Sequence, residues 1–294
     1  MSGVDEVSVE EAFPLYHAGP VNLSMIQPNF LLDTCPLPRQ ILELKQLTTK
    51  FIQLSDFPKE DLLQHLDDTK VFIENGLKTG VVLVHCYYGV SRSATVVIAY
   101  VMHKYSLSYN DAFQKVKSKR AIVYPNQGFV SQLKLYKEMG YKIDKNNMKY
   151  KVYRLSIAAD KVKQAKILPQ DFFDLIKPDP ALIRIQPEPK VYRCKKCRRI
   201  VAAESNLILH QDAQSTVKRY CTKTYFIEPL SWMNNITQST QGKLHCPKCK
   251  TKLGSFSWIM GCLCPCSCQV APAFYLTPSK IDLTNVVKNV EVTI

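Results

Sequence analysis

The stretch Gly80-Val-Val-Leu-Val-His-Cys-Tyr-Tyr-Gly-Val-Ser-Arg-Ser93 decides the fold of the first half of this 294-residue chain. It begins with a continuous run of β-branched and other apolar residues, which is typical of a strand buried in a parallel sheet. The apolar segment from Ser93 to Tyr105 follows at once and predicts a helix. A buried strand, a short loop and a helix in this order indicate an α/β domain.

The loop between this strand and this helix has the composition of a phosphate-binding nucleophile site. Cys86 would lie at its base, where inward-pointing backbone N–H groups and a helix N-terminus bind a phosphate dianion. The same field lowers a thiol pKa from ~8.5 into the range of ~3.5–7.5, so that a thiolate forms near neutral pH. Gly89 permits a tight turn, Arg92 offers a planar fork for two phosphoryl oxygens, and Ser93 can donate a hydrogen bond to the sulfur.

We therefore predict a catalytic role for this loop. Cys86 is the expected nucleophile, and Arg92 and Ser93 are expected to assist it. The residues expected to surround the phosphate are Tyr87, Tyr88, Gly89, Val90, Ser91 and Arg92. The alternative, a buried structural cysteine after a strand, is common for cysteine alone. It does not explain why His, Cys, Gly, Arg and Ser occur together at these spacings.

A cysteinyl-phosphate mechanism also needs a general acid for the leaving oxygen and later a base for the attacking water. Asp56 is the first candidate, because it follows an expected strand and opens a loop that could reach over the pocket. Asp61 is the second candidate, although a carboxylate at the start of a helix is usually only a cap. Asp33 is a third and more remote candidate.

Apolar periodicity predicts the other elements and the domain organisation. Short strands are expected at 30–32 and 51–54, and helices at 39–47, 58–75, 93–105, 111–119, 127–139 and 146–166. Gly140 is expected to end the helix that precedes it. Proline content and charge then predict a first domain, 1–145, a helical and proline-rich connector, 146–190, and a cysteine-rich domain, 191–294.

Nine of the 11 cysteines follow residue 193, and their spacing indicates metal binding. Two Cys-x2-Cys knuckles enclose a histidine and a further cysteine, so the first six candidate ligands are Cys194, Cys197, His210, Cys221, Cys246 and Cys249. Four more cysteines lie between Cys262 and Cys268. Two tetrahedral Zn²⁺ sites need eight ligands, so this last cluster must supply two. We expect structural zinc rather than disulfides, because no secretory signal is recognisable and intracellular thiols stay reduced.

The formal charge of +14 is concentrated in the second half of the chain. Residues 151–294 carry 22 Lys and Arg against 10 Asp and Glu, a net of +12, whereas residues 1–150 carry a net of only +2. The basic run 193–199 has three interpretations: a solvated knuckle surface, a nuclear-import patch or a nucleic-acid contact. Aromatic residues that could stack on bases, but that more often form a core, are Tyr192, Tyr220, Tyr225 and Phe226. No run of ~20 apolar residues predicts a membrane span.

The His85–Ser93 loop resembles the signature of the cysteine-dependent protein tyrosine phosphatases, and specifically that of the dual-specificity group. Asp56 matches the acid position of that family, and the segment 120–133 resembles its last helices. The segments 192–199, 221–229 and 244–258 resemble the zinc-binding region of the dual specificity protein phosphatase 12 family. The resemblance implies a phosphatase-like α/β domain followed by a small, mainly β, zinc-stapled domain.

The same resemblance implies hydrolysis of phosphotyrosine and phosphoserine/threonine in proteins, in the nucleus and cytoplasm. It also implies a pre-ribosome, rRNA or ribosomal-protein partner for the basic zinc domain. An alternative is that this partner role is the main function and that phosphatase activity is dispensable. An RNA 5′-phosphatase, which uses a similar loop, is a third hypothesis.

The resemblance also bears on single positions. It places the last two zinc ligands at Cys264 and Cys266, whereas the Cys-Ser-Cys tripeptide would select Cys266 and Cys268. Two features depart from the family. The segment before Asp56 is short, as though a helix were lost or replaced. Tyr88 stands where relatives usually have a small residue, and we expect tolerance there because loop side chains can point away from the phosphate.

Overall fold

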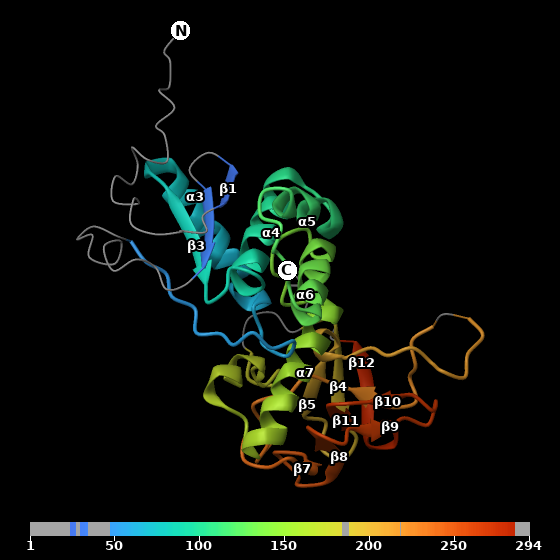
Figure 1. Ribbon diagram of the computed structural model, residues 1–294. Coiled ribbons are helices and arrows are strands. Elements are labelled where there is room, and N and C mark those ends of the chain that lie inside the picture. The colour runs from blue at the N-terminus through green and yellow to red at the C-terminus, as the bar shows by residue number, and fades with distance from the viewer. Residues whose placement is uncertain (1–23, 28–29, 35–47, 184–187, 218, 286–294) are drawn as a thin grey trace, which may run out of the picture. The chain divides into compact units, whose positions relative to one another are not determined.

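The computed structural model describes residues 24–27, 30–34, 48–183, 188–217 and 219–285. The chain forms two compact units, which divide between Ile143 and Asp144 (Figure 1). No helix within the described residues is both long enough and apolar enough to cross a membrane. The helix expected at 39–47 lies outside the described residues.

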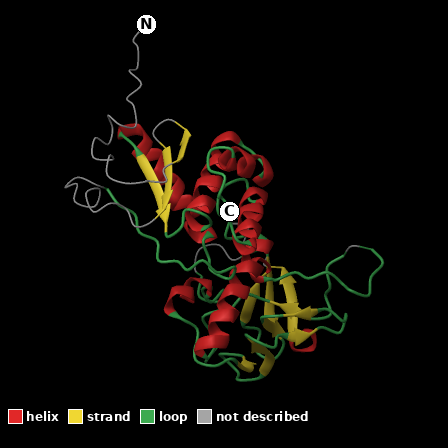
Figure 2. Ribbon diagram, in the orientation of Figure 1, coloured by secondary structure: helices red, strands yellow, loops and turns green. Residues whose placement is uncertain are grey.

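The first unit contains a three-stranded sheet in the order β1-β2-β3 (Figure 2). Its strands are β1 (Ser24–Gln27), β2 (Phe30–Thr34) and β3 (Val82–Cys86). β2 runs parallel to β3, with Thr34 opposite Cys86, whereas β1 is antiparallel to β2. The parallel strand expected before the loop is therefore confirmed. Its carboxyl end, where open α/β sheets carry their ligand sites, is Cys86 itself.

The strand expected at 51–54 is wrong, because residues 48–60 form loop and turns. Phe51 is 87% exposed, and the carbonyl of Leu54 accepts a hydrogen bond from Arg92 Nη1 at 3.1 Å. An alternating side-chain pattern does not make a strand unless a neighbouring backbone supplies partners for its N–H and C=O groups.

The helices of the first unit, in its described residues, are η1 (Leu63–His65), α3 (Leu66–Thr79), α4 (Arg92–Tyr105), α5 (Tyr109–Lys117) and α6 (Gln127–Glu138). α4 is the central helix, and every residue from Ser93 to Met102 is buried. Such a helix is apolar all round because other elements cover all of its faces. Its first residue is Arg92.

The ends of α5 and α6 follow the usual capping rules. The side chains of Ser108 and Asn126 accept hydrogen bonds from the first-turn N–H groups of α5 and α6. Gly140 adopts a φ of +72° just beyond α6, as expected for a residue that ends a helix. The helix expected from Pro58 begins later, at η1 and α3, after a turn that precedes it.

The second unit combines one long helix with small antiparallel sheets. Its helices are α7 (Met148–Ala165) and the short 3-10 segments η2 (Gln170–Leu175), η3 (Glu204–Asn206) and η4 (Pro278–Lys280). Its strands are β4 (Lys190–Cys194), β5 (Ile200–Ala203), β6 (Tyr225–Phe226), β7 (Gln241–His245), β8 (Lys252–Ser257), β9 (Cys262–Leu263), β10 (Gln269–Val270), β11 (Ala273–Leu276) and β12 (Ile281–Asn285). The sheets have the orders β12-β4-β5, β6-β11-β8-β7 and β10-β9.

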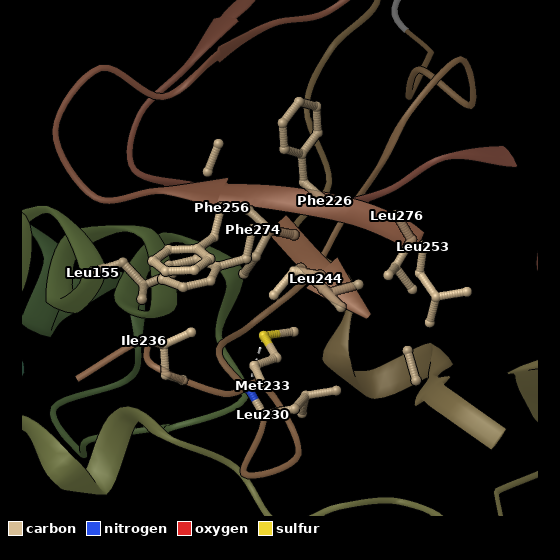
Figure 3. Packing of buried hydrophobic residues seen from close by; sticks show 14 of the residues in the cluster. Leu155, Phe226, Leu230, Met233, Ile236, Leu244, Leu253, Phe256, Phe274 and Leu276 are labelled. Carbon is tan, nitrogen blue, oxygen red and sulfur yellow. Dashed lines mark hydrogen bonds between the residues drawn. The ribbon is translucent and has the colours of Figure 1, made fainter. Parts of the chain in front are cut away.

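A single hydrophobic core joins α7 to these sheets. The rings of Phe256 and Phe274 stack, with centroids 5.7 Å apart, and Leu155 of α7 belongs to the same cluster (Figure 3). The indole of Trp258 is fully buried and donates a hydrogen bond to the carbonyl of Ile236 at 2.7 Å. The segment 146–190, expected as a connector, therefore differs from that expectation. Its helix buries an apolar face, at about 1.5–3 kcal/mol per large side chain, and is part of the second unit.

Candidate functional site

The loop after β3 surrounds the sulfur of Cys86 with hydrogen-bond donors. The backbone N–H of Gly89 lies 3.3 Å from Sγ, and the hydroxyl of Ser93 lies 3.1 Å from it. Gly89 has a φ of +64°, a left-handed conformation that costs glycine nothing and that reverses the chain around the sulfur. The strand that ends at Cys86 and the helix that starts at Arg92 therefore hold the loop from both sides.

These donors lower the pKa of the Cys86 thiol. Burial by itself would raise that pKa, since it disfavours the charged form. The hydroxyl of Ser93 and the backbone N–H groups of Ser93, Gly89 and Tyr88 oppose burial by donating to the sulfur, and together they outweigh it. The result is a thiolate that forms at lower pH than that of an ordinary cysteine, which is the condition for a nucleophile.

Arg92 adds an unsatisfied cationic donor to the loop. Its Nη1 binds the carbonyl of Leu54, but its buried Nε has no hydrogen-bond partner among the described residues. A buried donor without a partner costs about 1–3 kcal/mol. An anion in the loop would relieve this cost, and a guanidinium can donate two parallel N–H hydrogen bonds to two oxygens of a phosphoryl group.

Asp56 lies against the same loop. Its Oδ1 accepts hydrogen bonds from the hydroxyl of Ser91 at 2.7 Å and from the side-chain amide of Asn126 at 2.8 Å. The backbone N–H of Asn126 donates in turn to the Ser91 hydroxyl at 3.2 Å. Gly128 allows this approach, because a Cβ there would lie 1.9 Å from the carbonyl oxygen of Pro58. The segment that carries Asp56 therefore packs between α6 and the loop that follows β3.

The two other acid candidates are placed differently. Asp61 is buried, and its Oδ1 accepts the backbone N–H of Gln64 at 3.2 Å, so it serves the turn before α3. Asp33 lies in β2 opposite His85, and its side chain is outside what the structure describes. Of the three carboxylates, the structure brings only Asp56 into described contact with the loop.

Two supporting residues were missed by the sequence analysis. The buried Arg120 donates from Nε to the carbonyl of Gly89 at 3.1 Å, which fixes the tight turn. Asn126 caps α6 and binds Asp56 with the same side chain. Its position just before a helical segment was a capping signal, but the contact with a residue seventy positions earlier had no signal in the sequence.

The side chains of the loop separate into inward and outward groups. Ser91 is buried and Val90 is half-buried, whereas Tyr87 and Tyr88 are exposed. The backbone N–H of Tyr88 nevertheless acts on the Cys86 sulfur. We expected the loop to tolerate a large side chain at position 88. This arrangement is consistent with that expectation, because the backbone of Tyr88 contacts the thiol while its ring is exposed.

The structure brings all eight candidate metal ligands together in two quartets. The first quartet consists of Cys194, Cys197, Cys246 and Cys249, and the second of His210, Cys221, Cys264 and Cys266. Within each quartet the ligand atoms all lie within 4.8 Å of one another. The described cysteines are all free thiols, so the disulfide alternative is wrong for them.

The spacing within the quartets fits a tetrahedral zinc ion. Zn–S bonds of ~2.3 Å would separate two sulfur ligands by ~3.8 Å. The sulfurs of Cys194 and Cys249 are 3.7 Å apart, and those of Cys221 and Cys264 are also 3.7 Å apart. The Nε2 atom of His210 lies 3.4 Å from the sulfur of Cys266, so this ring nitrogen is the one that faces the quartet.

A repeated turn explains why Cys266 faces the second quartet and Cys268 does not. In each knuckle the residue directly after the second ligand has a positive φ: 62° at Arg198, 60° at Lys250 and 71° at Ser267. Its backbone N–H donates to the carbonyl of the first ligand of the knuckle, at 2.8–2.9 Å. The turn at Ser267 therefore directs Cys264 and Cys266 to one side, in the manner of the other two knuckles.

Residues 21–139 match the family model described as the dual specificity phosphatase catalytic domain. Dual specificity protein phosphatase MPK-4 of Drosophila melanogaster is 43% identical, and the match covers 90% of this chain and 82% of that protein. Dual specificity protein phosphatase 12 of Homo sapiens is 34% identical, with coverage of 81% and 75%. Tyrosine-protein phosphatase YVH1 of Saccharomyces cerevisiae is 32% identical, with coverage of 81% and 78%.

The chain belongs to the dual specificity phosphatase family. It is a protein phosphatase, and the loop around Cys86 is the part of its catalytic domain that carries the nucleophile-like geometry. The matches cover most of the chain, so the similarity extends beyond the phosphatase domain into the second unit.

The basic run of this phosphatase is partly neutralised by its own acidic residues. Lys195 and Arg198 pair with Asp282, and Arg199 pairs with Asp179. Of the four aromatic residues considered for base stacking, Tyr192 and Phe226 are buried in the core and Tyr225 packs against that core. Tyr220 remains exposed. The alternative that most of these rings form a core is therefore confirmed.

Proposed function

We propose that the first unit hydrolyses phosphotyrosine and phosphoserine/threonine in proteins through a cysteinyl-phosphate intermediate. The observation that carries this proposal is the sulfur of Cys86, which accepts hydrogen bonds from Ser93 and Gly89. The same loop holds the Nε of Arg92, which has no hydrogen-bond partner in the part of the chain that the structure describes. A thiolate, a ring of N–H donors and a cation in one loop match the needs of phosphoryl transfer.

In the first step the sulfur attacks phosphorus while the bond to the leaving oxygen breaks. Arg92 and the loop N–H groups hold the three equatorial oxygens, on which the charge is spread. Asp56, in its protonated form, gives its proton to the leaving oxygen. Both described contacts of this carboxyl use Oδ1, so Oδ2 is the atom that we assign to proton transfer.

In the second step water attacks the phosphorus of the intermediate and the S–P bond breaks. The Asp56 carboxylate takes the proton of that water, and inorganic phosphate leaves with the oxygen of water. The hydroxyl of Ser93, 3.1 Å from Sγ, stabilises the departing thiolate. The cycle ends with the same protonation states with which it began.

The Asp56→Asn variant tests the acid. Asparagine keeps an oxygen for Ser91 and Asn126 but has no proton to give, so poor leaving groups should suffer most. We expect kcat on a phosphothreonine peptide to fall by about 10²–10⁴-fold, and kcat on 4-nitrophenyl phosphate to fall much less. Steady-state kinetics on both substrates measure this difference.

Asp61→Asn is the matched control, because it removes the same charge from the second candidate while keeping an oxygen for Gln64. It should not change the ratio of the two rates. Equal losses on both substrates in Asp56→Asn would mean that Asp56 supports the loop and another group is the acid. Hydrolysis of RNA 5′-phosphates with no effect of Asp56→Asn would favour the RNA 5′-phosphatase alternative.

We propose that the two quartets hold structural Zn²⁺. Both are complete with four protein ligands, so neither leaves a position for water or substrate. Zinc supplies cross-links between distant segments of the second unit. We assign no step of the phosphatase reaction to it.

We also propose that the second unit binds a pre-ribosome, rRNA or ribosomal-protein partner, with the protein in the nucleus and cytoplasm. Support comes from the net charge of +12 in residues 151–294 and from the exposed Lys195 and Lys196 between the first two zinc ligands. Phosphate contacts by lysines make such binding strongly dependent on salt. We propose phosphatase activity as the main function and this binding role as the alternative.

A charge-reversal pair tests this partner role in the full chain. Lys195→Glu with Lys196→Glu should lower co-sedimentation with large ribosomal subunit precursors several-fold and reduce its salt dependence. Lys243→Glu with Lys252→Glu makes the same charge change at exposed positions of β7 and β8 and should leave co-sedimentation unchanged. Equal losses in the two pairs would indicate only non-specific attraction.

A further inference from the structure

Two adjacent tyrosine rings stand exposed on the loop that carries the nucleophile. Tyr87 is 58% exposed and Tyr88 is 66% exposed. Their ring centroids are 4.6 Å apart and their planes are 80° apart, an edge-to-face contact. Both rings are exposed, whereas Cys86 and residues 89–93 are buried or half-buried.

The reaction geometry places these rings beside the substrate. In phosphoryl transfer the leaving oxygen lies in line with the attacking sulfur, on the far side of phosphorus. The backbone N–H groups of Tyr88 and Gly89 donate to the sulfur at the base of the loop, so the open side of the loop, where a phosphate would bind, faces away from Cys86. The part of the substrate behind the leaving oxygen must therefore pass the edge of the loop on this open side, where side chains of the loop lie.

The two rings have different surroundings. Tyr87 also lines a cavity of about 330 Å³ beside Cys86, which is bounded on its other sides by apolar residues that include Leu54 and Ile73. Tyr88 does not line that cavity and is the more exposed of the two. The edge-to-face contact holds the ring of Tyr88 in place, so that little entropy is lost when a ligand packs on it.

We propose that Tyr88 is a specificity-determining residue whose ring packs on the aryl group of phosphotyrosine and favours it over phosphoserine and phosphothreonine. The proposal rests on the proposed phosphatase function and assigns a preference within it. Phosphotyrosine carries a flat ring directly behind the leaving oxygen, whereas the alkyl phosphoesters have nothing to stack. An aromatic pair of this kind corresponds to a preference of about 2- to 12-fold.

The test compares two peptides of identical sequence that carry either phosphotyrosine or phosphothreonine. The measured quantity is the ratio of their kcat/KM values for the full chain. Tyr88→Ala should lower this ratio by about 2- to 12-fold, and Tyr88→Phe, which keeps the ring, should restore it. Tyr105→Ala removes a 43% exposed ring at the far end of α4 and should leave the ratio unchanged.

The outcomes separate the inference from the function on which it rests. If Tyr88→Ala lowers kcat/KM for both peptides by the same factor, the ring only supports the loop and the inference is wrong. If Tyr88→Phe behaves like Tyr88→Ala, the hydroxyl group rather than the ring face is responsible, which also overturns it. If the wild-type chain hydrolyses neither peptide nor 4-nitrophenyl phosphate, the proposed function fails together with the inference.

Discussion

Replacing Cys86 by serine is expected to lower kcat/KM for 4-nitrophenyl phosphate by on the order of 10⁴-fold or more. The hydrogen bonds from Ser93 and Gly89 stabilise a thiolate, but they are far too weak to ionise an alcohol at neutral pH. The serine variant therefore keeps the shape of the loop and loses the nucleophile. Steady-state kinetics of the full chain measure the loss directly.

The Ser93→Ala variant should give a graded form of the same effect. It removes the 3.1 Å hydrogen bond to Sγ, so the pKa of Cys86 should rise toward its ordinary value. A raised pKa means less thiolate below it, and activity should be lost at low pH and recovered as pH increases. The acidic limb of the pH profile of kcat/KM, together with alkylation of Cys86 by iodoacetamide, reports this shift.

Cys262→Ser is the control for these variants, because Cys262 lies outside both the loop and the two quartets. It should retain full turnover with an unchanged pH profile. Full activity in Cys86→Ser would remove Cys86 from the mechanism and with it the proposed intermediate. An unchanged profile in Ser93→Ala would mean that the backbone N–H groups alone set the thiol pKa.

Loss of one buried zinc ligand is expected to unfold the second unit. Cys246→Ala should lower the zinc content from two ions per chain to one or none, because its sulfur belongs to the first of the two quartets. Structural Zn²⁺ contributes about 10–16 kcal/mol of apparent binding free energy in small domains. That figure is as large as the whole stability of a typical domain, about 5–15 kcal/mol.

Zinc release with 4-(2-pyridylazo)resorcinol and hydrogen exchange resolved along the chain measure this prediction. Exchange should rise throughout 144–285 in Cys246→Ala, whereas Cys268→Ser should keep both ions, because Cys268 is outside the quartets. A wild-type chain without zinc would contradict the metal assignment. Retention of two ions by Cys246→Ala would show that another residue completes the first site.

Local patterns predicted the parts of this fold that depend on neighbours in the chain. The helices at 93–105, 111–119 and 127–139 were placed to within two residues of α4, α5 and α6. Periodicity and caps suffice for such elements, because a helix satisfies its own backbone. The strand expected at 51–54 failed for the complementary reason, since its hydrogen-bond partners had to come from elsewhere.

The second unit shows the same division. A basic helical stretch followed by prolines predicts a connector at 146–190, yet α7 places an apolar face in the core. Tyr192 and Phe226, considered as stacking platforms, are core residues for the same reason. Which face of an amphipathic segment is buried depends on the elements that pack against it. The sequence of that segment alone does not predict those elements.

The stretch from Gly80 to Ser93 is sufficient by itself to predict that a thiol, a glycine turn and an arginine lie close together at the end of a strand. Fewer than ten residues join Cys86 to Ser93. Because β3 ends at Cys86 and α4 begins at Arg92, the short loop between them can adopt few conformations. Each Cys-x2-Cys knuckle is equally local, because one turn suffices to bring its two sulfurs together.

Tertiary structure alone decided which knuckles come together in one quartet and which carboxylate contacts the loop. The first quartet joins Cys194 to Cys249 and the second joins His210 to Cys266, so the two sites interleave along the chain. Other pairings of the same knuckles satisfy every local rule. The choice among them, like the contact of Asp56 with Asn126, follows from the packing of segments more than forty residues apart, which no local pattern describes.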